Sequence, residues 1–417
     1  MEDERRLRIL FVSPYFDERA GTPADALDRF PILTELPRQL HERGHQVRVL
    51  GLGAQNARFE RDGIHYRWIA AAPPIRLAGR ILHRWKPHYG PAYYQPSLAL
   101  ARAVRALRPD IVHVFGLTLD PQLALIRLLA YRRSRIVAHY HGGAPAQGPL
   151  RRRLQALALG RVDAAYFTSR VQAQPWIDAG LLNEDGDHQV LETSSPFTGM
   201  DRDAARELTG MRGDPVYLSA GRLHPIKDPL TMLRGFAHIA RAQPEARLYL
   251  YYLTDELLHD SRALVHSFPH LRERVEFRGR ARPDEMQAIY SSADILLQAS
   301  LREWSGLAIL EAMSCGCIPV VSDIPAFRAI LGDERHGRFF EPGDAAGLAA
   351  AALSIEEREA LSTAVKRHFE DQLSFAAIAR DLARNYRSLV APAQTSAKAT
   401  SRRRQESQTP QGSAPPS

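Results

Sequence analysis

The 417-residue sequence predicts an α/β protein with two domains, each built around a doubly wound parallel sheet. A chain of this length is too long for one hydrophobic core and suits two domains of nearly equal size. Short apolar runs alternate with helical segments in both halves, which is the pattern of parallel strands joined by crossover helices. The run at 189–200 interrupts this alternation, so we expect domains at residues 1–193 and 194–373.

The first half begins with a buried strand, Arg8–Ser13, which leads into a loop containing Gly21 and then a helix ending near His41. The other expected elements are the strands Gln46–Leu50, Asp110–Phe115, Arg135–His139 and Val162–Thr168 and the helices Pro121–Tyr131 and Ser169–Ala179. The segment 70–96 is rich in Pro, Arg and aromatic residues and lacks regular periodicity. Long irregular segments within compact domains are often functional, although a packed surface loop explains this composition equally well.

The second half continues the alternation and ends in a helix and a polar tail. The expected strands are Val216–Ala220, Arg247–Tyr252, Val275–Phe277, Asp294–Gln298 and Pro319–Ser322. A last helix is expected at Ser374–Leu389, within a separate segment at residues 374–390. Residues 391–417 contain almost no large apolar side chain, so this tail cannot bury a core and is expected to be disordered.

Glu303 lies where the strand Asp294–Gln298 passes into an apolar helix. Ser305 is a suitable N-cap for this helix, which Gly306 then opens toward Leu307. Ligands of open α/β sheets bind at the carboxyl ends of the strands. The free backbone N–H groups and the positive dipole end of a helix start favour an anion. The sequence therefore predicts an anion site beside Glu303.

A second loop of the same kind follows the strand Val216–Ala220 and contains Arg222 and Lys227. Asp228 as N-cap and Pro229 at the first helical position begin the next helix. Two cations beside a helix start form a suitable site for a diphosphate. Two ordinary surface cations in an arginine-rich chain remain the alternative.

Glu311 is a carboxylate within an apolar helical run, between Leu310 and Ala312. A buried carboxylate without partners costs several kcal/mol or becomes protonated. A pair of neighbouring ligand hydroxyls, such as a ribose diol, would satisfy both of its oxygens. We therefore interpret Glu311 as a ligand-binding residue.

Together these motifs resemble those of the retaining GT-B glycosyltransferases of the family 4 type, also called glycosyl transferases group 1. The residues that carry the resemblance are the Gly221-Arg222-Leu223…Lys227 loop, the Glu303-x7-Glu311 spacing and the run Glu311-Ala312-Met313-Ser314-Cys315-Gly316-Cys317-Ile318-Pro319-Val320-Val321. The sequence departs from the family at Gly21-Thr22, where relatives have two adjacent glycines. It also lacks the Asn-Gly-Val-Asp turn at the linker and a glycine turn after Leu250.

The resemblance implies two Rossmann-like domains facing across a cleft, with the acceptor on the first domain and the donor mainly on the second. The helix in residues 374–390 would pack back on the first domain. Arg222 and Lys227 would neutralise the donor diphosphate, Glu311 would hold the ribose, and Ser305, Gly306 and Leu307 would offer backbone donors. Glu303 and, from the first domain, His141 would contact the sugar during catalysis, and Gly21 would lie near the donor phosphate.

The resemblance further implies a nucleoside-diphosphate sugar as co-substrate, attack by the acceptor on the front face, and the departing phosphate as the base. No cofactor and no metal are expected, because side-chain cations would stabilise the leaving group. The sequence contains no Asp-x-Asp on a strand-end loop. His113, inside its strand, is interpreted as a core histidine.

The net charge of +8 is unevenly distributed. The segment from Gly63 to Val162 holds 16 Arg or Lys residues against Asp110 and Asp120, a net charge of +14 that leaves −6 for the rest. Such a region suggests an anionic partner such as a membrane surface or an anionic acceptor, or else a solvated arginine-rich face. No recognised nucleic-acid module is present, so no nucleic-acid partner is expected.

We expect a cytoplasmic protein, in peripheral contact with the inner face of the membrane, that serves glycan biosynthesis. No apolar run is long enough to span a bilayer, and the charged start Met1–Arg6 does not resemble a signal peptide. The two cysteines, Cys315 and Cys317, are too close for a relaxed disulfide and lack zinc-ligand spacing. They are expected to be small core residues.

Three other functions remain open at this point. A sugar-nucleotide epimerase of the same fold would share the diphosphate site but act without an acceptor. A non-catalytic nucleotide- or nucleic-acid-binding protein would use the arginine-rich half, and a third possibility keeps the glycosyltransferase fold as a scaffold only. Nucleotide titration and product analysis distinguish these alternatives.

Overall fold

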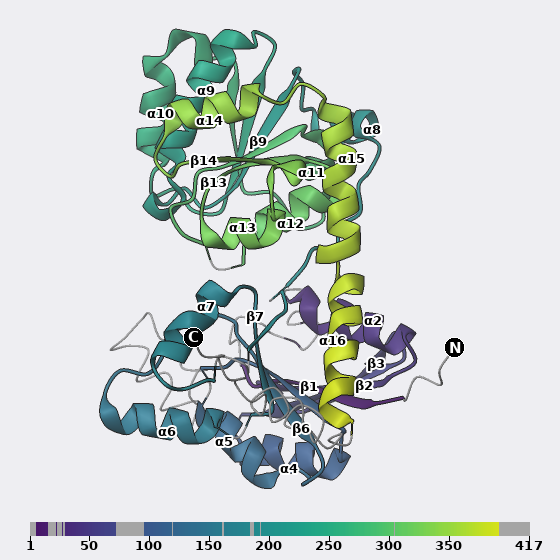
Figure 1. Cartoon of the computed structure of the whole chain (residues 1–417). Helices are drawn as coiled ribbons and strands as arrows, with labels where there is room; N and C mark the ends of the chain where they lie inside the picture. The colour runs from purple at the N-terminus through teal and green to yellow at the C-terminus, as the bar shows by residue number, and fades with distance from the viewer. Residues whose placement is uncertain are drawn as a thin grey trace, which may run out of the picture.

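The computed structural model describes residues 6–15, 22, 27, 30–71, 96–118, 120–160, 162–183, 187–191, 193–303 and 305–391. These residues form two α/β domains, which lie one above the other in Figure 1. Each domain has one mainly parallel sheet with helices on both faces, so the predicted fold class is confirmed.

The first domain contains an eight-stranded sheet in the order β3-β4-β2-β1-β5-β6-β7-β8. Its strands are β1 Arg8–Ser13, β2 Gln46–Gly53, β3 Ala57–Arg61, β4 Ile64–Ala70, β5 Ile111–Phe115, β6 Arg135–His139, β7 Ala164–Phe167 and β8 Asp187–Gln189. Among the strands that the structure describes in this sheet, β3 alone runs antiparallel to its neighbour. The predicted strands β1 and β6 are confirmed to the residue, whereas β3, β4 and β8 were missed.

The hairpin of β3 and β4 turns at Asp62 and Gly63, which both have positive φ angles, of 54° and 73°. Two such residues between paired strands are typical of a type I′ turn, for which Asp-Gly is a strong sequence signal. The hairpin could therefore have been predicted from this dipeptide. Its strand β3 is largely exposed, which weakened the apolar alternation that reveals strands.

The helices of the first domain flank both faces of its sheet. They are α2 Glu35–Glu42, α4 Leu98–Leu107, α5 Asp120–Leu129, α6 Pro149–Leu159 and α7 Arg170–Asp178, with a 3-10 turn at Pro31–Leu33. One core lies under α4, α5 and α7, and the other lies under α2 and the last helix of the chain. The irregular segment expected at 70–96 lies almost entirely outside the described residues.

The second domain contains a six-stranded parallel sheet in the order β11-β10-β9-β12-β13-β14. Its strands are β9 Val216–Gly221, β10 Arg247–Tyr252, β11 Val275–Gly279, β12 Ile295–Gln298, β13 Ile318–Ser322 and β14 Arg338–Phe340. Its helices are α8 Arg202–Thr209, α9 Pro229–Ala242, α10 Leu258–Ser267, α11 Met286–Ser292, α12 Leu307–Ser314, α13 Pro325–Leu331, α14 Ala345–Leu353 and α15 Arg358–His368. All five predicted strands are present, and β14 was missed.

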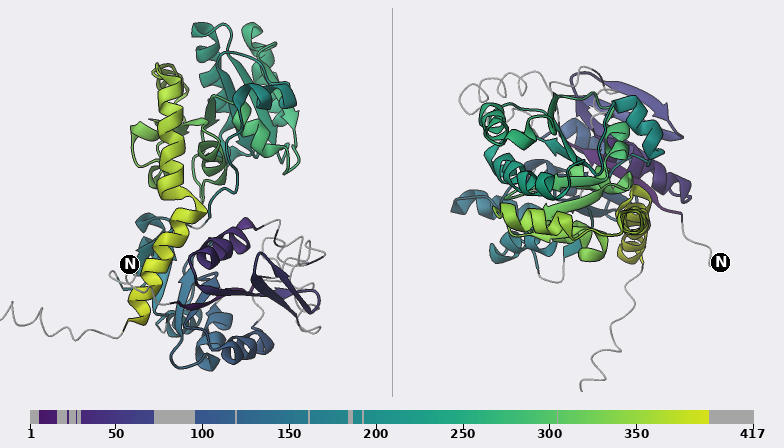
Figure 2. Two further views of the ribbon diagram at one scale, coloured as in Figure 1. Left: turned by 90° about the vertical axis from the view of Figure 1, so that its right-hand side faces the viewer. Right: turned by 90° about the horizontal axis from the view of Figure 1, so that it is seen from above.

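The last helix, α16 Phe375–Val390, leaves the second domain and packs on the first. Ser374 caps it by accepting a hydrogen bond from the backbone N–H of Ala377 at 3.2 Å. Figures 1 and 2 show α15 and α16 running almost end to end along one side of both domains. Leu382 and Tyr386 of α16 share a core with Phe11 and Leu36, so the chain passes between the domains twice.

Two further expectations concern single residues. Cys315 and Cys317 are both buried and unlinked, as expected for small core residues. His113 is fully buried, which confirms its interpretation as a core histidine. Within the part of the chain that the structure describes, no helix is long and apolar enough to cross a membrane. The tail expected from residue 391 onward lies, apart from Ala391, outside the described residues.

Candidate functional site

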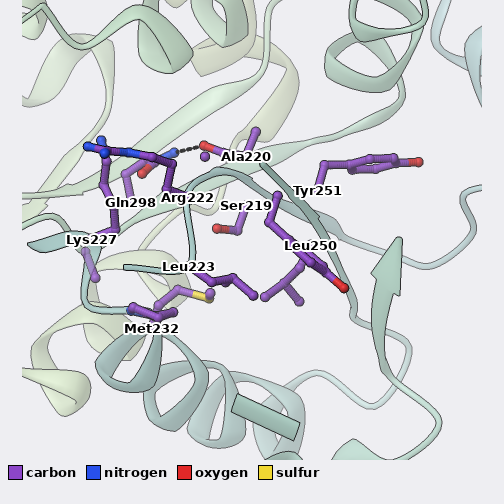
Figure 3. Close-up of a pocket in the computed structure, with 13 residues that line it drawn as sticks. Ser219, Ala220, Arg222, Leu223, Lys227, Met232, Leu250, Tyr251 and Gln298 are labelled. Atoms are coloured by element: carbon purple, nitrogen blue, oxygen red, sulfur yellow. Dashed lines mark hydrogen bonds between the residues drawn. The ribbon is translucent and has the colours of Figure 1, made fainter. Parts of the chain in front are cut away.

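A pocket opens at the carboxyl ends of β9, β10 and β12 in the second domain. Its lining includes Arg222 and Lys227 from the loop after β9 and Tyr251 from the end of β10 (Figure 3). Gln298 at the end of β12 donates a hydrogen bond from Nε2 to the carbonyl oxygen of Ala220 at 2.7 Å, which ties the two strand ends together. Sequence reasoning missed Tyr251 and Gln298 as lining residues.

The loop that carries the two cations is tightly shaped. Pro225–Lys227 forms a single 3-10 turn, and the ring nitrogen Nδ1 of His224 accepts a hydrogen bond from the backbone N–H of Ile226 at 3.1 Å. Asp228 then caps α9 by accepting from Thr231 N at 3.2 Å, as predicted. Figure 3 shows the Arg222 and Lys227 side chains reaching the same side of the pocket.

Glu303 contacts Lys227 directly: the Lys227 Nζ donates to Glu303 Oε1 in a salt bridge. The two side chains are only 19% and 15% exposed, so water screens this pair less than a surface pair. Ser300, fully buried, also donates its hydroxyl to Glu303 Oε1 at 2.9 Å. The structure thus joins two strand-end loops that the sequence placed 76 residues apart, and it adds Ser300, which sequence reasoning missed.

Arg222 is exposed, and among the described contacts its guanidinium has no hydrogen bond or ion pair. The backbone at Gly221, directly before it, has a φ of 158°, close to extended. The pocket therefore has one cation paired with a carboxylate and a second cation available to an incoming anion. This arrangement fits a ligand that carries at least two negative charges.

The start of α12 differs from the prediction. Gly306, with a φ of 60°, is the N-cap, and no side chain caps the helix, so the assignment of Ser305 as the cap is wrong. The left-handed conformation favours glycine, and a Cβ here would lie 2.6 Å from Ile330 Cδ1. Leu307 is 42% exposed and begins the helix, four residues after Glu303 in the chain.

Glu311 lies on α12, and Tyr290 of α11 donates a hydrogen bond to its Oε2 at 2.8 Å. Burial raises the pKa of the Glu311 carboxyl to about 7, and the hydrogen bond from Tyr290 offsets part of this rise. The sequence predicted an unusual buried carboxylate, and the structure provides one protein partner for it. Among the described contacts, its other oxygen, Oε1, has no hydrogen-bond partner.

His141 follows β6 at the carboxyl edge of the first sheet, as predicted. Its ring lies 5.2 Å from that of Phe115 and 5.1 Å from that of His139. Burial, and then the nearby charge of His141, lower the pKa of His139 well below its usual range. His139 therefore stays neutral behind His141 and supports it as part of a layer of rings.

The remaining predicted residue, Gly21, lies outside the described residues, so its place near a phosphate stays a prediction. The structure brings Arg222, Lys227 and Glu303 together in the second domain. His141 belongs to the other domain, and neither Glu303 nor Glu311 is among the residues that line the pocket. Across the described ranges, no group of three His, Cys, Asp or Glu side chains could hold a metal ion.

Two family models match this chain. The model described as "Glycosyl transferase 4-like domain" matches residues 31–185, and the model described as "Glycosyl transferases group 1" matches residues 214–358. The two matches fall on the first and second domains respectively, and together they cover most of the described chain.

Curated proteins similar to this chain include several glycosyltransferases. Mannosylfructose-phosphate synthase of Agrobacterium fabrum is 26% identical over 40% of this chain and 38% of its own length. A D-inositol 3-phosphate glycosyltransferase of Saccharomonospora viridis is 29% identical over 43% of this chain and 46% of its own length. The chain thus matches less than half the length of these two relatives. It matches phosphatidyl-myo-inositol mannosyltransferase of Mycolicibacterium smegmatis more fully, with 25% identity over 85% of this chain and 86% of that protein.

Solved structures share the fold over nearly the whole chain. Sucrose-phosphate synthase from Thermosynechococcus elongatus superposes with a TM-score of 0.64 at 18% identity, covering 92% of this chain and 99% of the other. HepE from Anabaena, solved in complex with UDP and glucose, superposes with a TM-score of 0.61 at 17% identity, covering 92% and 100%. At these identities the likeness shows a common two-domain architecture.

Proposed function

Because this chain belongs to the GT-B glycosyltransferases of the group 1 type, we propose that it is a retaining enzyme that uses a nucleoside-diphosphate sugar. The sugar is transferred to a hydroxyl group of an acceptor. The observation that carries this proposal is the contact between Lys227 and Glu303, with Arg222 beside them, at the carboxyl edge of the second sheet. Cations for a leaving diphosphate and a carboxylate for the sugar thus lie within one small region.

The diphosphate is held by the two cations. Arg222 offers a planar guanidinium that can bind two phosphate oxygens at once, and Lys227 offers a point charge. As the bond to the sugar breaks, negative charge grows on the phosphate oxygens, and both cations stabilise it where it develops. The first N–H groups of α12, at Gly306 and Leu307, add donors from the neighbouring strand end, with Ser305 leading into them.

Glu303 stabilises the opposite charge. A sugar that loses its leaving group passes through a positively charged, oxocarbenium-like transition state, which a nearby carboxylate favours. The hydrogen bond from Ser300 and the salt bridge to Lys227 hold the Glu303 carboxylate in one orientation. Because Glu303 is partly shielded from water, its attraction for the positive transition state is stronger than it would be at the surface. The acceptor attacks from the face that the phosphate leaves, and the departing phosphate accepts the acceptor's proton.

Glu311 and His141 position the donor from two sides. Glu311 has Tyr290 on one carboxyl oxygen and accepts hydroxyl groups of the ribose with its carboxylate. His141 lies at the carboxyl edge of the first sheet and hydrogen-bonds the donor sugar from there. Donor binding therefore uses both domains, although the cations come from the second alone.

Metal independence is part of the proposal, since Arg222 and Lys227 take the place that a divalent cation has in metal-dependent transferases. Activity is expected to survive excess EDTA. Loss of activity that returns on addition of Mg²⁺ or Mn²⁺ would contradict this point.

The comparisons guide the choice of substrates. HepE was solved with UDP and with glucose, so UDP and UDP-glucose are the first ligands to test, followed by the GDP and ADP series. The names of three relatives mention inositol phosphate, phosphatidyl-inositol and a fructose phosphate. We infer an acceptor that carries an anionic group beside its hydroxyl, in keeping with the basic region 63–162. The same region would give peripheral contact with anionic lipid at the cytoplasmic face of the membrane.

A thermal-shift screen with UDP, GDP, ADP and their sugars tests the donor site first. A one-site ligand at 100 times its dissociation constant adds about 2.7 kcal/mol of stability, which such a screen detects easily. Product analysis with the best donor then separates transfer from epimerisation, since an epimerase changes the donor sugar without any acceptor. A protein that binds none of these nucleotides would contradict the proposed function.

A further inference from the structure

Helix α6 carries a stripe of exposed leucines beside three consecutive arginines. Leu150, Leu154 and Leu157 are 74%, 57% and 57% exposed. Positions separated by four and then three residues lie on one side of an α-helix, so the three side chains form a continuous apolar stripe. Largely exposed leucines add little to the stability of the fold, and a row of them indicates a surface that binds a partner.

The opposite side of α6 is anchored, so the helix cannot turn to bury these leucines. Ala158 and Leu159 are almost completely buried. The buried side-chain oxygen Oε1 of Gln155 accepts a hydrogen bond from the backbone N–H of Ala146 at 2.7 Å. Figure 1 shows α6 at the edge of the first domain beside α5, the described element with which it makes its main contact. The stripe is therefore a fixed feature of the folded chain.

The ionisable residues of α6 itself are all arginines. From Pro121 to Val162 the sequence contains eight arginines and neither Asp nor Glu. Arg151 and Arg153 are exposed and, by helical spacing, flank the leucine stripe on its two sides. A helix that combines an apolar stripe with flanking arginines fits a surface that is apolar inside and negative outside.

We propose that α6 docks the protein on an anionic bilayer by inserting Leu150, Leu154 and Leu157 among the lipids while the arginines bind headgroups. Charge complementarity selects this occupant, because a second copy of the same arginine-rich helix would be repelled. The membrane contact proposed above for the whole basic region is thus assigned to one helix, α6, and gains an apolar contribution from its leucines. The role of this contact in acceptor delivery rests on the proposed function, whereas the contact itself does not.

The position of α6 links docking to the site. The loop from His141 to Gly148 connects the end of β6 to α6, and Tyr140 fixes it by donating from its hydroxyl to the carbonyl oxygen of Gly143 at 2.8 Å. A bilayer under α6 therefore lies a short loop away from His141. An acceptor anchored in that bilayer would approach the first-domain edge without leaving the lipid.

A polarity-sensitive fluorophore on a single new cysteine tests insertion directly. The natural cysteines are 7% and 0% exposed, so a thiol-reactive dye labels Leu154→Cys selectively. Leu208→Cys on α8 is the matched control, because Leu208 is 71% exposed and lies in the second domain. Vesicles rich in phosphatidylserine should shift the emission of the Leu154→Cys conjugate to the blue and leave the emission of the Leu208→Cys conjugate unchanged.

Vesicle sedimentation without any nucleotide gives the quantitative test. The double variant Leu154→Glu/Leu157→Glu should bind anionic vesicles at least roughly tenfold more weakly than the parent chain, whereas Leu208→Glu should bind like the parent. High salt should weaken binding of the parent only in part, because the apolar contribution is not screened. Circular dichroism and UDP binding by the double variant check that the fold and the donor site survive.

Three outcomes would overturn the inference. The first is equal vesicle binding by the parent and the double variant, and the second is an unshifted emission of the Leu154→Cys conjugate. The third is a lipid-free dimer of the parent that the double variant dissolves, which would assign the stripe to a second copy of the chain. Because sedimentation needs no nucleotide, a negative result here with intact UDP binding leaves the proposed function standing.

Discussion

The carboxyl edges of the two sheets differ in chemistry although the two domains share one architecture. At the edge of the second sheet, the two cations Arg222 and Lys227 line a pocket, and Lys227 also pairs with the carboxylate of Glu303. At the edge of the first sheet, His141 lies against Phe115 and His139, in a layer of rings. Under the proposed function, the second edge stabilises charges that form during the reaction, whereas His141 at the first edge positions the sugar.

The charges away from the two edges show the same division. In the second domain the buried carboxylate of Asp294 pairs with Arg202 and Arg206, at 3.1 and 2.7 Å. In the first domain a stretch of 42 residues, 121–162, has eight arginines and no acid of its own. Arg127 and Arg135 of this stretch pair with Asp163, just beyond it, at 4.0 and 2.9 Å, but the stretch as a whole keeps an excess of positive charge. We therefore expect the second domain to bind a small ligand and the first to meet a larger anionic partner. The following variants test this division, from the largest expected effect to the smallest.

Removing the charge of Glu303 should have the largest effect. Glu303→Gln keeps the size of the side chain but loses its stabilisation of a positive transition state, so turnover should fall roughly 100- to 1,000-fold. Donor affinity should change much less, because the role lies in the transition state. Steady-state kinetics and calorimetry measure the two effects separately. The exposed Glu370→Gln is the control, and full turnover in Glu303→Gln would refute the assigned role.

Removing either cation should weaken nucleotide binding. Arg222→Ala and Lys227→Ala should each cost roughly 1.5–3 kcal/mol of nucleoside-diphosphate affinity, as for a lost charged hydrogen bond. Lys227→Ala also leaves Glu303 without its ion-pair partner, so Arg222→Ala is the cleaner variant. The highly exposed Arg367 on α15 provides a matched Arg367→Ala control for isothermal titration calorimetry. Unchanged affinity in both site variants would show that the diphosphate binds elsewhere.

Glu311 gives a prediction on stability and pH. Its pKa is about 7 in the folded chain against an ordinary value of 4.5, so stability is lost as the pH rises from about 4.5 through 7. Glu311→Gln keeps an acceptor for the Tyr290 hydroxyl without an ionisable group. The variant should gain roughly 2–3 kcal/mol of unfolding free energy over the parent at pH 8, and little at pH 4.5. Urea unfolding at both pH values measures this, and an equal difference at both would refute the pKa assignment.

Glu311→Gln should also weaken binding of the donor. A carboxylate accepts two ribose hydroxyls better than an amide does, so parent binding should tighten as the pH rises through 7, and Glu311→Gln should lose that dependence. Glu311→Ala should bind the donor more weakly still. Nucleotide affinity that is independent of pH in both chains would remove Glu311 from the ribose site.

His141→Ala should have the smallest effect on turnover, and it tests most directly how the two sheet edges differ in function. If the first edge only positions the sugar, the loss of one hydrogen bond should lower turnover about tenfold, while UDP affinity stays within a factor of about two. Calorimetry with UDP and kinetics with the full donor separate the two. A loss of UDP affinity as large as that of Arg222→Ala would mean that the first domain shares the diphosphate, and the proposed division would fail.

Several features of this chain were determined by its sequence alone. The strands β1, β6 and β10 begin and end where apolar runs predicted, because a buried parallel strand needs a continuous apolar segment. The Asp228–Pro229 start of α9 followed from capping chemistry, which acts over three or four residues. The motifs around Arg222 and Glu303 identified the family and, through strand-end position, the edge of the sheet where they lie.

The tertiary structure decided everything that depends on contacts between distant segments. The salt bridge of Lys227 and Glu303, the bond from Tyr290 to Glu311 and the packing of Gly306 against Ile330 each join elements whose approach no local pattern encodes. Sequence assigned the α12 cap to Ser305 because serine is the better capping residue in isolation. The sequence alone also could not show that the leucines of α6 face outward. Periodicity finds the apolar side of a helix, but only the packed fold reveals whether that side meets the core.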